Sequence, residues 1–155
     1  MRFYGQYLQR LDEKHRVVVP RKLREMIGEA ELRNGLFITR GFDNCLFLFP
    51  ASQWESVAAE ISAVHFTGFD ARMVQRMFFS EAVEVQPDKL GRVPMPEPLR
   101  QLAGIEEEVL FIGTSDRIEL WSPSRWAALK AKHDPQYEEF AQALYQVLAS
   151  RQKNQ

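Results

Sequence analysis

Two acid–arginine pairs with the same spacing are the residues of this sequence best suited to chemistry. Asp12 precedes Arg16 by four positions, and Asp88 precedes Arg92 by four positions. A carboxylate at the start of a tight turn accepts hydrogen bonds from the turn amides and pairs with a guanidinium at the end of the turn. We expect Asp12 and Asp88 to hold their hairpins in this way and not to contact DNA directly, because a carboxylate is repelled by phosphate.

Catalysis is a weaker interpretation of the same residues. Two carboxylates can act as general acid and base, but each one here has an arginine four residues on, and a duplicated motif indicates a duplicated structural role. The histidines and the cysteine are scattered without metal-ligand spacing, and the chain has no Gly-rich phosphate loop or nucleophile motif. We therefore expect no enzyme activity, no metal, no cofactor and no small-molecule substrate.

The first pair lies among cations that can bind nucleic acid. A guanidinium on a projecting turn, such as that of Arg16, can reach phosphates or the O6/N7 edge of guanine. Lys14 lies at the turn apex, where phosphate binding and a solvated side chain are both open interpretations. The candidate DNA-binding residues are Arg10, Lys14, His15, Arg16, Arg21 and Lys22.

The net charge of −1 hides an asymmetry along the chain. Residues 1–24 hold seven cations against two acids, whereas residues 77–124 hold four cations against nine acids. Because salt screens charges beyond about 10 Å, a local basic segment can bind phosphates even on a nearly neutral protein. Charge alone leaves a solvated charged surface equally open.

The chain contains an internal repeat. Residues 12–24 align with residues 88–100, and the match includes the aspartate, the arginine, a Val-containing segment, a proline and Leu-Arg. Farther on, residues 36–38 align with residues 110–112, and residues 48–54 align with residues 120–126, so that Trp54 matches Trp126. The offset between the copies changes only from 76 to 72. The duplication predicts two copies of one structural unit.

The two copies differ at the turn apex. Gly91 suits a turn position that needs a positive φ, whereas His15 occupies the equivalent position in the first copy. His15 is expected to adopt a left-handed backbone at some cost, or to lie in a turn of another type. A DNA contact by this histidine and a solvent-exposed side chain are both open.

Periodicity and Pro/Gly positions predict the same succession of elements in each copy. A short helix follows Pro20 in one copy and the prolines 96 and 98 in the other, with Gly28 and Gly104 at their ends. Asp70 is the expected N-cap of a connecting helix. The expected strands are 3–10, 16–19, 36–40 and 45–49, then 82–86, 92–95, 109–112 and 118–121; the other expected helices are 51–64, 70–79, 123–132 and one that starts at residues 134–135.

A unit of roughly 45 residues cannot bury enough apolar surface by itself, so the two copies are expected to share a core. The predicted class is α+β, with two units related by a pseudo-twofold axis and interleaved into a small β-barrel. The C-terminal helix has an apolar stripe that predicts a packing face, on its own chain or on a neighbour. The expected organisation is 3–50 for the first unit, 51–79 for a helical connector, 80–123 for the second unit and 124–155 for C-terminal helices.

These motifs resemble a known family. Asp-x-x-x-Arg followed by a Val-rich strand, proline and Leu-Arg resembles the AbrB/SpoVT swapped-hairpin superfamily. Two such motifs, each followed by an aromatic hairpin and a tryptophan, look like the MraZ family over roughly residues 3–126. The family usually has glycine at both turn apices, so His15 departs from its pattern.

The resemblance implies a sequence-specific transcriptional regulator that binds double-stranded DNA at repeated boxes upstream of its own cell-division and cell-wall operon. It also implies a homo-oligomeric ring larger than a dimer, associated with the nucleoid. Single Cys45 agrees with a reducing cytoplasm, and no apolar run is long enough to span a bilayer. The alternative is a ring-forming protein-interaction module without DNA binding, carried by the acidic second copy and the C-terminal helix.

Overall fold

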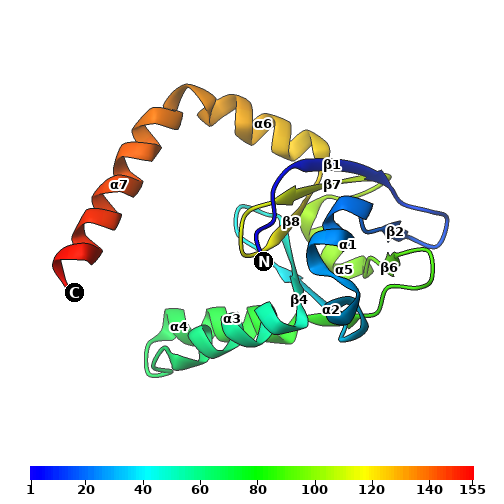
Figure 1. The fold of residues 1–155 in the computed structure, drawn as a ribbon, viewed down its shortest axis with the longest axis horizontal. Helices are drawn as coiled ribbons and strands as arrows, with labels where there is room; N and C mark the ends of the chain where they lie inside the picture. The colour runs from blue at the N-terminus through cyan, green and yellow to red at the C-terminus, as the bar shows by residue number, and fades with distance from the viewer. The chain divides into compact units, whose positions relative to one another are not determined.

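The computed structural model describes all residues, Met1–Gln155, and the chain divides into two units, Met1–Pro123 and Ser124–Gln155. Figure 1 traces the chain and labels its elements. The strands are β1 (Gln6–Arg10), β2 (Arg16–Val18), β3 (Leu36–Arg40), β4 (Leu46–Pro50), β5 (Val83–Val85), β6 (Arg92–Pro94), β7 (Glu108–Gly113) and β8 (Ile118–Trp121). The helices are α1 (Arg21–Ile27), α2 (Glu29–Arg33), α3 (Ala51–Ala63), α4 (Phe69–Ser80), α5 (Glu97–Ala103), α6 (Pro123–His133), the 3₁₀ turn η1 (Asp134–Gln136) and α7 (Tyr137–Lys153).

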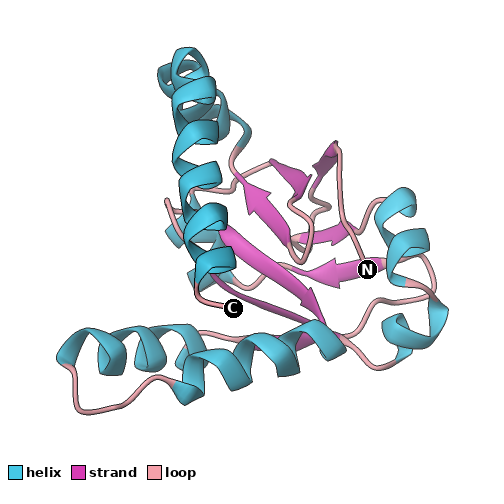
Figure 2. Ribbon diagram, turned by 60° about the vertical axis from the view of Figure 1, so that its left-hand side comes forward, coloured by secondary structure: helices cyan, strands magenta, loops and turns pink.

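The larger sheet has the order β1-β7-β8-β4-β3-β5, so strands of the two copies are interleaved in it. Figure 2 draws the strands in magenta. The first strand of copy one, β1, pairs antiparallel with β7 of copy two. The equivalent strand of copy two, β5, pairs antiparallel with β3 of copy one. Each copy therefore supplies an outer strand that completes the hairpin of the other copy.

Strands β2 and β6 form a separate two-stranded antiparallel sheet, with Val17 opposite Val93. Two further backbone hydrogen bonds extend this ladder symmetrically. The Met95 N–H donates to the His15 carbonyl (3.0 Å), and the Val19 N–H donates to the Gly91 carbonyl (2.8 Å). The two Asp–Arg turns therefore lie at opposite ends of one short ladder.

One apolar cluster holds both copies together, as the size of each copy predicted. Val17 and Val93 are each 1% exposed, and Leu23 of α1 and Leu99 of α5 are both buried in the same cluster. Burial of such side chains stabilises the fold in proportion to the apolar area removed from water. The expected shared core is confirmed, and neither copy has a separate one.

Proline and glycine set the bounds of the short helices, as predicted. Pro20 and Pro96 occupy the N-cap positions of α1 and α5, where a missing N–H costs nothing. Gly28 and Gly104 are the C-cap residues, and Gly104 has the left-handed φ of 65°. Helix α2 was not predicted, since it is only five residues long and follows Gly28 directly.

The helical connector matches its prediction except at one cap. Asp70 is not the N-cap of α4; the helix begins at Phe69, and Gly68 is the N-cap residue. Asp70 lies in the first turn, where a carboxylate is stabilised by the positive end of the helix dipole. The predicted aspartate cap was therefore wrong, because the helix begins one residue before Asp70.

Trp54 of α3 fixes the connector to the sheet through an aromatic stack. Its ring lies parallel to Phe37 of β3, with centroids 4.8 Å apart, and to Phe78 of α4, 5.4 Å apart. Two polar contacts add to this link: the buried Thr39 hydroxyl donates to the Phe78 carbonyl (2.6 Å), and Arg40 forms an ion pair with Glu81. Helices α3 and α4 are thus held on β3 by both apolar and polar contacts.

The mixed α+β class is confirmed, with a six-stranded antiparallel sheet at its centre. The hydrogen-bonded ladder of that sheet ends at β1 on one side and at β5 on the other. The closed, interleaved barrel therefore stays a prediction. No helix in the structure combines the length and the apolar character needed to cross a membrane.

We expect Trp54→Ala to lower the free energy of unfolding by about 3 kcal/mol, because the substitution empties the space between two stacked rings. Trp54→Phe keeps an aromatic ring in the stack and should lose less than half of that amount. Urea unfolding followed by circular dichroism measures both variants. Equal losses for alanine and phenylalanine would contradict the stacking role.

Candidate nucleic-acid interface

The first turn, residues 12–16, is held by the Asp12 carboxylate. Its Oδ1 accepts hydrogen bonds from the backbone N–H groups of Lys14 and Arg16, both at 2.9 Å. Its Oδ2 accepts a charge-assisted hydrogen bond from Arg16 Nε at 2.8 Å. The Asp12 N–H donates to the Arg16 carbonyl, which closes the hairpin.

The second turn, residues 88–92, repeats this geometry contact for contact. Asp88 Oδ1 accepts from the N–H groups of Leu90 and Arg92 at 2.9 Å, and Oδ2 accepts from Arg92 Nε at 2.7 Å. The structural role expected for Asp12 and Asp88 from the sequence thus agrees with their contacts. Both carboxylates are occupied within their own turns.

The same hydrogen bonds lower the pKa of both carboxyl groups. For Asp12 the largest cause is the backbone N–H of Arg16, and partial desolvation opposes it. For Asp88 the backbone N–H of Arg92 has the same effect. A group that accepts several hydrogen bonds in its charged form resists protonation.

The apex residues of both turns have a left-handed backbone, with φ of 57° at His15 and 79° at Gly91. His15 therefore adopts the glycine conformation, and the two turns are of one type. A Cβ atom added at Gly91 would lie 2.8 Å from the Arg24 guanidinium. Glycine adopts this φ without strain, and any larger residue at position 91 would have to displace the end of the Arg24 side chain.

Arg24 and Arg100 are functional parts of the framework that the sequence did not reveal as such. Arg24 Nε donates to the Val19 carbonyl at 2.9 Å, and Arg100 Nε donates to the Met95 carbonyl at 2.8 Å. The Arg24 guanidinium also lies against Gly91 in the turn of the other copy. Their signal was the repeated Leu-Arg, but nothing in the sequence indicated that Arg24 reaches the other copy.

The two turns differ in the side chains that they present to solvent. Lys14 of the first turn is exposed, and the equivalent position in the second turn is Leu90, which is 63% exposed. Arg16 uses Nε for Asp12, so its two Nη groups remain available for a ligand. Arg92 likewise binds Asp88 through Nε, so the turns differ at the position before the left-handed residue, where the first has the donor Lys14 and the second has apolar Leu90.

The supporting cations are less free than the sequence suggested. Arg10 at the end of β1 lies 3.6 Å from Glu107, and Arg21 of α1 lies 3.0 Å from Glu25. Lys22 lies over the Tyr4 ring, 5.9 Å from its centroid. These exposed ion pairs are weak, so Arg10 and Arg21 can exchange their partners for phosphate, but Lys14 needs no such exchange.

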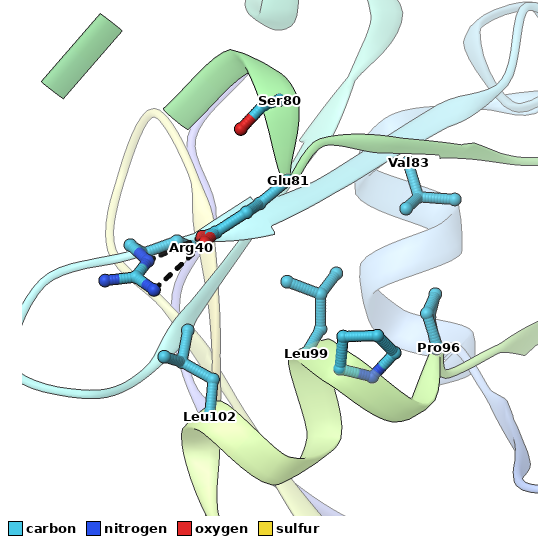
Figure 3. Close-up of a pocket in the computed structure, with 8 residues that line it drawn as sticks. Arg40, Ser80, Glu81, Val83, Pro96, Leu99 and Leu102 are labelled. Carbon is cyan, nitrogen blue, oxygen red and sulfur yellow. Dashed lines mark hydrogen bonds and ion pairs between the residues drawn. The ribbon is translucent and has the colours of Figure 1, made fainter. Parts of the chain in front are cut away.

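A small cavity elsewhere offers little chemistry. It has a volume of about 260 Å³, and its lining includes the apolar residues Val83, Pro96, Pro98, Leu99 and Leu102 together with Arg40 and Glu81 (Figure 3). Arg40 Nε and Nη2 donate to the Glu81 carboxylate at 2.6 and 3.0 Å, so each charge satisfies the other. No cluster of three or more His, Cys, Asp or Glu side chains is arranged to hold a metal ion.

The duplicated turn framework has a counterpart in a known family. The family profile described as "MraZ protein, putative antitoxin-like" matches the chain twice, over residues 2–77 and 78–147. The chain belongs to the MraZ family. The two matches divide the chain between the two copies of the repeat, and each contains one Asp–Arg turn.

Named relatives align with nearly the whole chain. A protein of Heliobacterium modesticaldum named transcriptional regulator MraZ is 42% identical over 142 residues, which are 92% of this chain and 96% of that protein. Proteins of the same name from Acetivibrio thermocellus, 38% identical over 142 residues, and Thermoanaerobacter sp., 40% identical over 140 residues, cover 92% and 90% of this chain and 96% and 94% of their own length. The similarity therefore covers most of both copies.

The lowered pKa values of Asp12 and Asp88 predict a loss of stability in acid. The folded pKa of each lies below the ordinary value of 3.8, so the stabilisation is fully present above that value. It is lost as the pH falls through the folded pKa, because protonation removes the acceptor of these hydrogen bonds. Urea unfolding between pH 7 and pH 2.5 should show this loss.

Replacing both aspartates by asparagine supplies the control for this acid effect. The double variant should be less stable at pH 7, and its free energy of unfolding should depend less on pH below about 4. An acid dependence equal to that of the natural sequence would show that other carboxyl groups cause the loss.

Substitutions at the two apices should differ in their effect on the free energy of unfolding. Gly91→Ala should lower the free energy of unfolding by about 1–2 kcal/mol, because alanine at a φ of 79° is strained and its Cβ displaces Arg24. His15→Gly should not destabilise the fold, since it relieves a left-handed residue. Thermal and urea unfolding measure both; destabilisation by His15→Gly as large as that by Gly91→Ala would contradict this assignment.

Proposed function

We propose that this chain is a sequence-specific transcriptional regulator that binds double-stranded DNA through its first turn. The observation that carries the proposal is that one turn, held by Asp12, presents both the exposed Lys14 side chain and the Arg16 Nη groups, which the bond to Asp12 leaves unused. The name transcriptional regulator, borne by relatives that cover at least 90% of the chain, supports it. This role needs no catalysis and no cofactor.

In this proposal Arg16 reads a guanine edge or binds a phosphate, and Lys14 binds a phosphate. Arg10, Arg21 and Lys22 add positive potential around the turn, and His15 contributes chiefly by its backbone conformation. The fixed turn matters because a preorganised donor loses little entropy on binding. The second turn has a framework role, since Leu90 offers no donor where Lys14 stands in the first.

We further propose that the two units, 3–50 and 80–123, with their connector 51–79, form a swapped-hairpin fold of the AbrB/SpoVT class. The pairing of β1 with β7 and of β5 with β3 supports that assignment. A single turn contacts little DNA, so useful affinity requires several copies. A ring larger than a dimer, bound to repeated boxes upstream of its own operon, gains affinity through effective concentration. Such a protein acts in the cytoplasm at the nucleoid.

Arg16→Ala and Arg92→Ala form a matched pair for testing this function. Both remove the same hydrogen bond to an aspartate at nearly equal exposure, 31% and 30% for the two arginine side chains, so both should lose similar stability. Arg16→Ala alone should weaken binding to DNA from upstream of the chain's own gene. Each lost guanine contact costs about 1–3 kcal/mol per engaged subunit.

A gel-shift titration with natural and scrambled upstream duplexes measures these variants, and circular dichroism confirms that both are folded. Equal affinity losses in two folded variants would mean that both turns bind DNA or that neither arginine does. Absence of DNA binding by the natural sequence would favour the protein-interaction alternative.

A further inference from the structure

An acid and a cation together form the tip of the first turn. The His15 N–H donates to the Asp12 carbonyl at 2.9 Å, so these two residues are the ends of a β-turn. The central residues of that β-turn are Glu13 and Lys14, and both are exposed. A carboxylate therefore lies directly beside the cation on which the proposed DNA binding depends.

The Glu13 carboxylate is not used by the fold. The oxygens of Asp12 hold the turn, whereas Glu13 has no hydrogen-bond or ion-pair partner within the chain. The second turn is the same type of β-turn and has Lys89 at the equivalent position. Glu13 thus lies outside the duplicated framework, and its charge is available to a ligand of the first turn only.

A duplex that contacts Lys14 also lies close to Glu13. Consecutive Cα atoms are about 3.8 Å apart, which is well within the Debye length of about 8 Å at physiological salt. Phosphate oxygens repel a carboxylate at such distances. The O6 and N7 atoms of guanine and the O4 atom of thymine are acceptors as well, so they offer a carboxylate no hydrogen bond.

Cytosine is the base whose major-groove edge fits a carboxylate. It presents the N4 amino group as a donor, and no acceptor accompanies that group on the same edge. Adenine also has an amino group, but its N7 acceptor lies beside it. An exposed acid at the tip of a DNA-binding turn therefore selects for cytosine.

We propose that Glu13 is a specificity-determining residue of the first turn, an inference that rests on the proposed DNA-binding function. In the specific complex its carboxylate accepts a hydrogen bond from the N4 amino group of a cytosine in the major groove. In a non-specific complex, where the turn contacts phosphates alone, the same carboxylate is repelled. One residue thereby favours the correct box and penalises other DNA.

The three polar side chains of the turn then have separate tasks. Lys14 supplies a charge for a phosphate, Arg16 supplies its Nη groups for a guanine edge or a phosphate, and Glu13 supplies an acceptor. Donors alone would bind any stretch of backbone, because phosphate contacts carry no sequence information. The acceptor at the tip restricts this binding to DNA that presents a cytosine amino group.

Glu13→Gln in the full chain tests this role, because it removes the charge and keeps the size of the side chain. Fluorescence anisotropy measures binding to duplex DNA from upstream of the chain's own gene and to a scrambled duplex of equal composition. The variant should bind the scrambled duplex about twofold tighter per engaged subunit, as expected for one charge about 8 Å from a phosphate in water. Its affinity for the upstream duplex should fall about tenfold, since a hydrogen bond to a charged group is lost.

Glu60→Gln is the control for net charge. It removes one exposed carboxylate from helix α3, outside the turn, and should leave the ratio of the two affinities unchanged. Circular dichroism confirms that both variants are folded.

Single base-pair substitutions in the upstream duplex identify the cytosine. The natural sequence should lose affinity when that base pair is changed. Glu13→Ala should show no preference at that pair, and Glu13→Gln should prefer adenine there, because a glutamine side chain pairs with N6 and N7 of adenine. Both variants should keep the preferences of the natural sequence at all other pairs.

Two results overturn the role of Glu13 alone. One is an unchanged ratio of affinities in Glu13→Gln, and the other is the same set of base-pair preferences in the natural sequence and in both variants. If the natural sequence binds the upstream and scrambled duplexes equally, the proposed sequence-specific function fails, and this inference fails with it.

Discussion

The exchange of outer strands between the two copies of the repeat is the interaction on which the rest of the structure depends. Strand β1 completes the sheet of copy two, and β5 completes that of copy one. A single copy would leave a hairpin with an unpaired edge and half of a core. Because both copies contribute to one apolar cluster, the duplication is a condition for folding and not an addition to a stable domain.

The two copies also present two turns of the same construction but with different apex side chains. The ladder between β2 and β6 fixes the backbone of both turns, and each aspartate fixes its own arginine. With the framework secured by the backbone and by these pairs, the apex side chains are free to differ. Lys14 in one copy and Leu90 in the other can therefore give the turns different ligands.

The sequence predicted the elements of the fold well because their signals are local. Pro20, Pro96 and the terminal glycines bound the short helices, and the repeat allowed each weak strand signal to be checked against its copy. What it did not predict depends on contacts between distant residues. The reach of Arg24 to the turn of the other copy and the pairing of Arg10 with Glu107 both depend on tertiary packing.

The central claim is that DNA contacts the apex of the first turn and not that of the second. Placing a benzophenone-bearing amino acid at Glu13 and, in a separate protein, at the equivalent Lys89 tests it directly, since both positions are exposed and neither holds its turn together. Irradiation with duplex DNA from upstream of the chain's own gene should cross-link DNA to position 13 and leave position 89 unlinked. Equal cross-linking at both positions, or cross-linking at position 89 alone, would contradict the account.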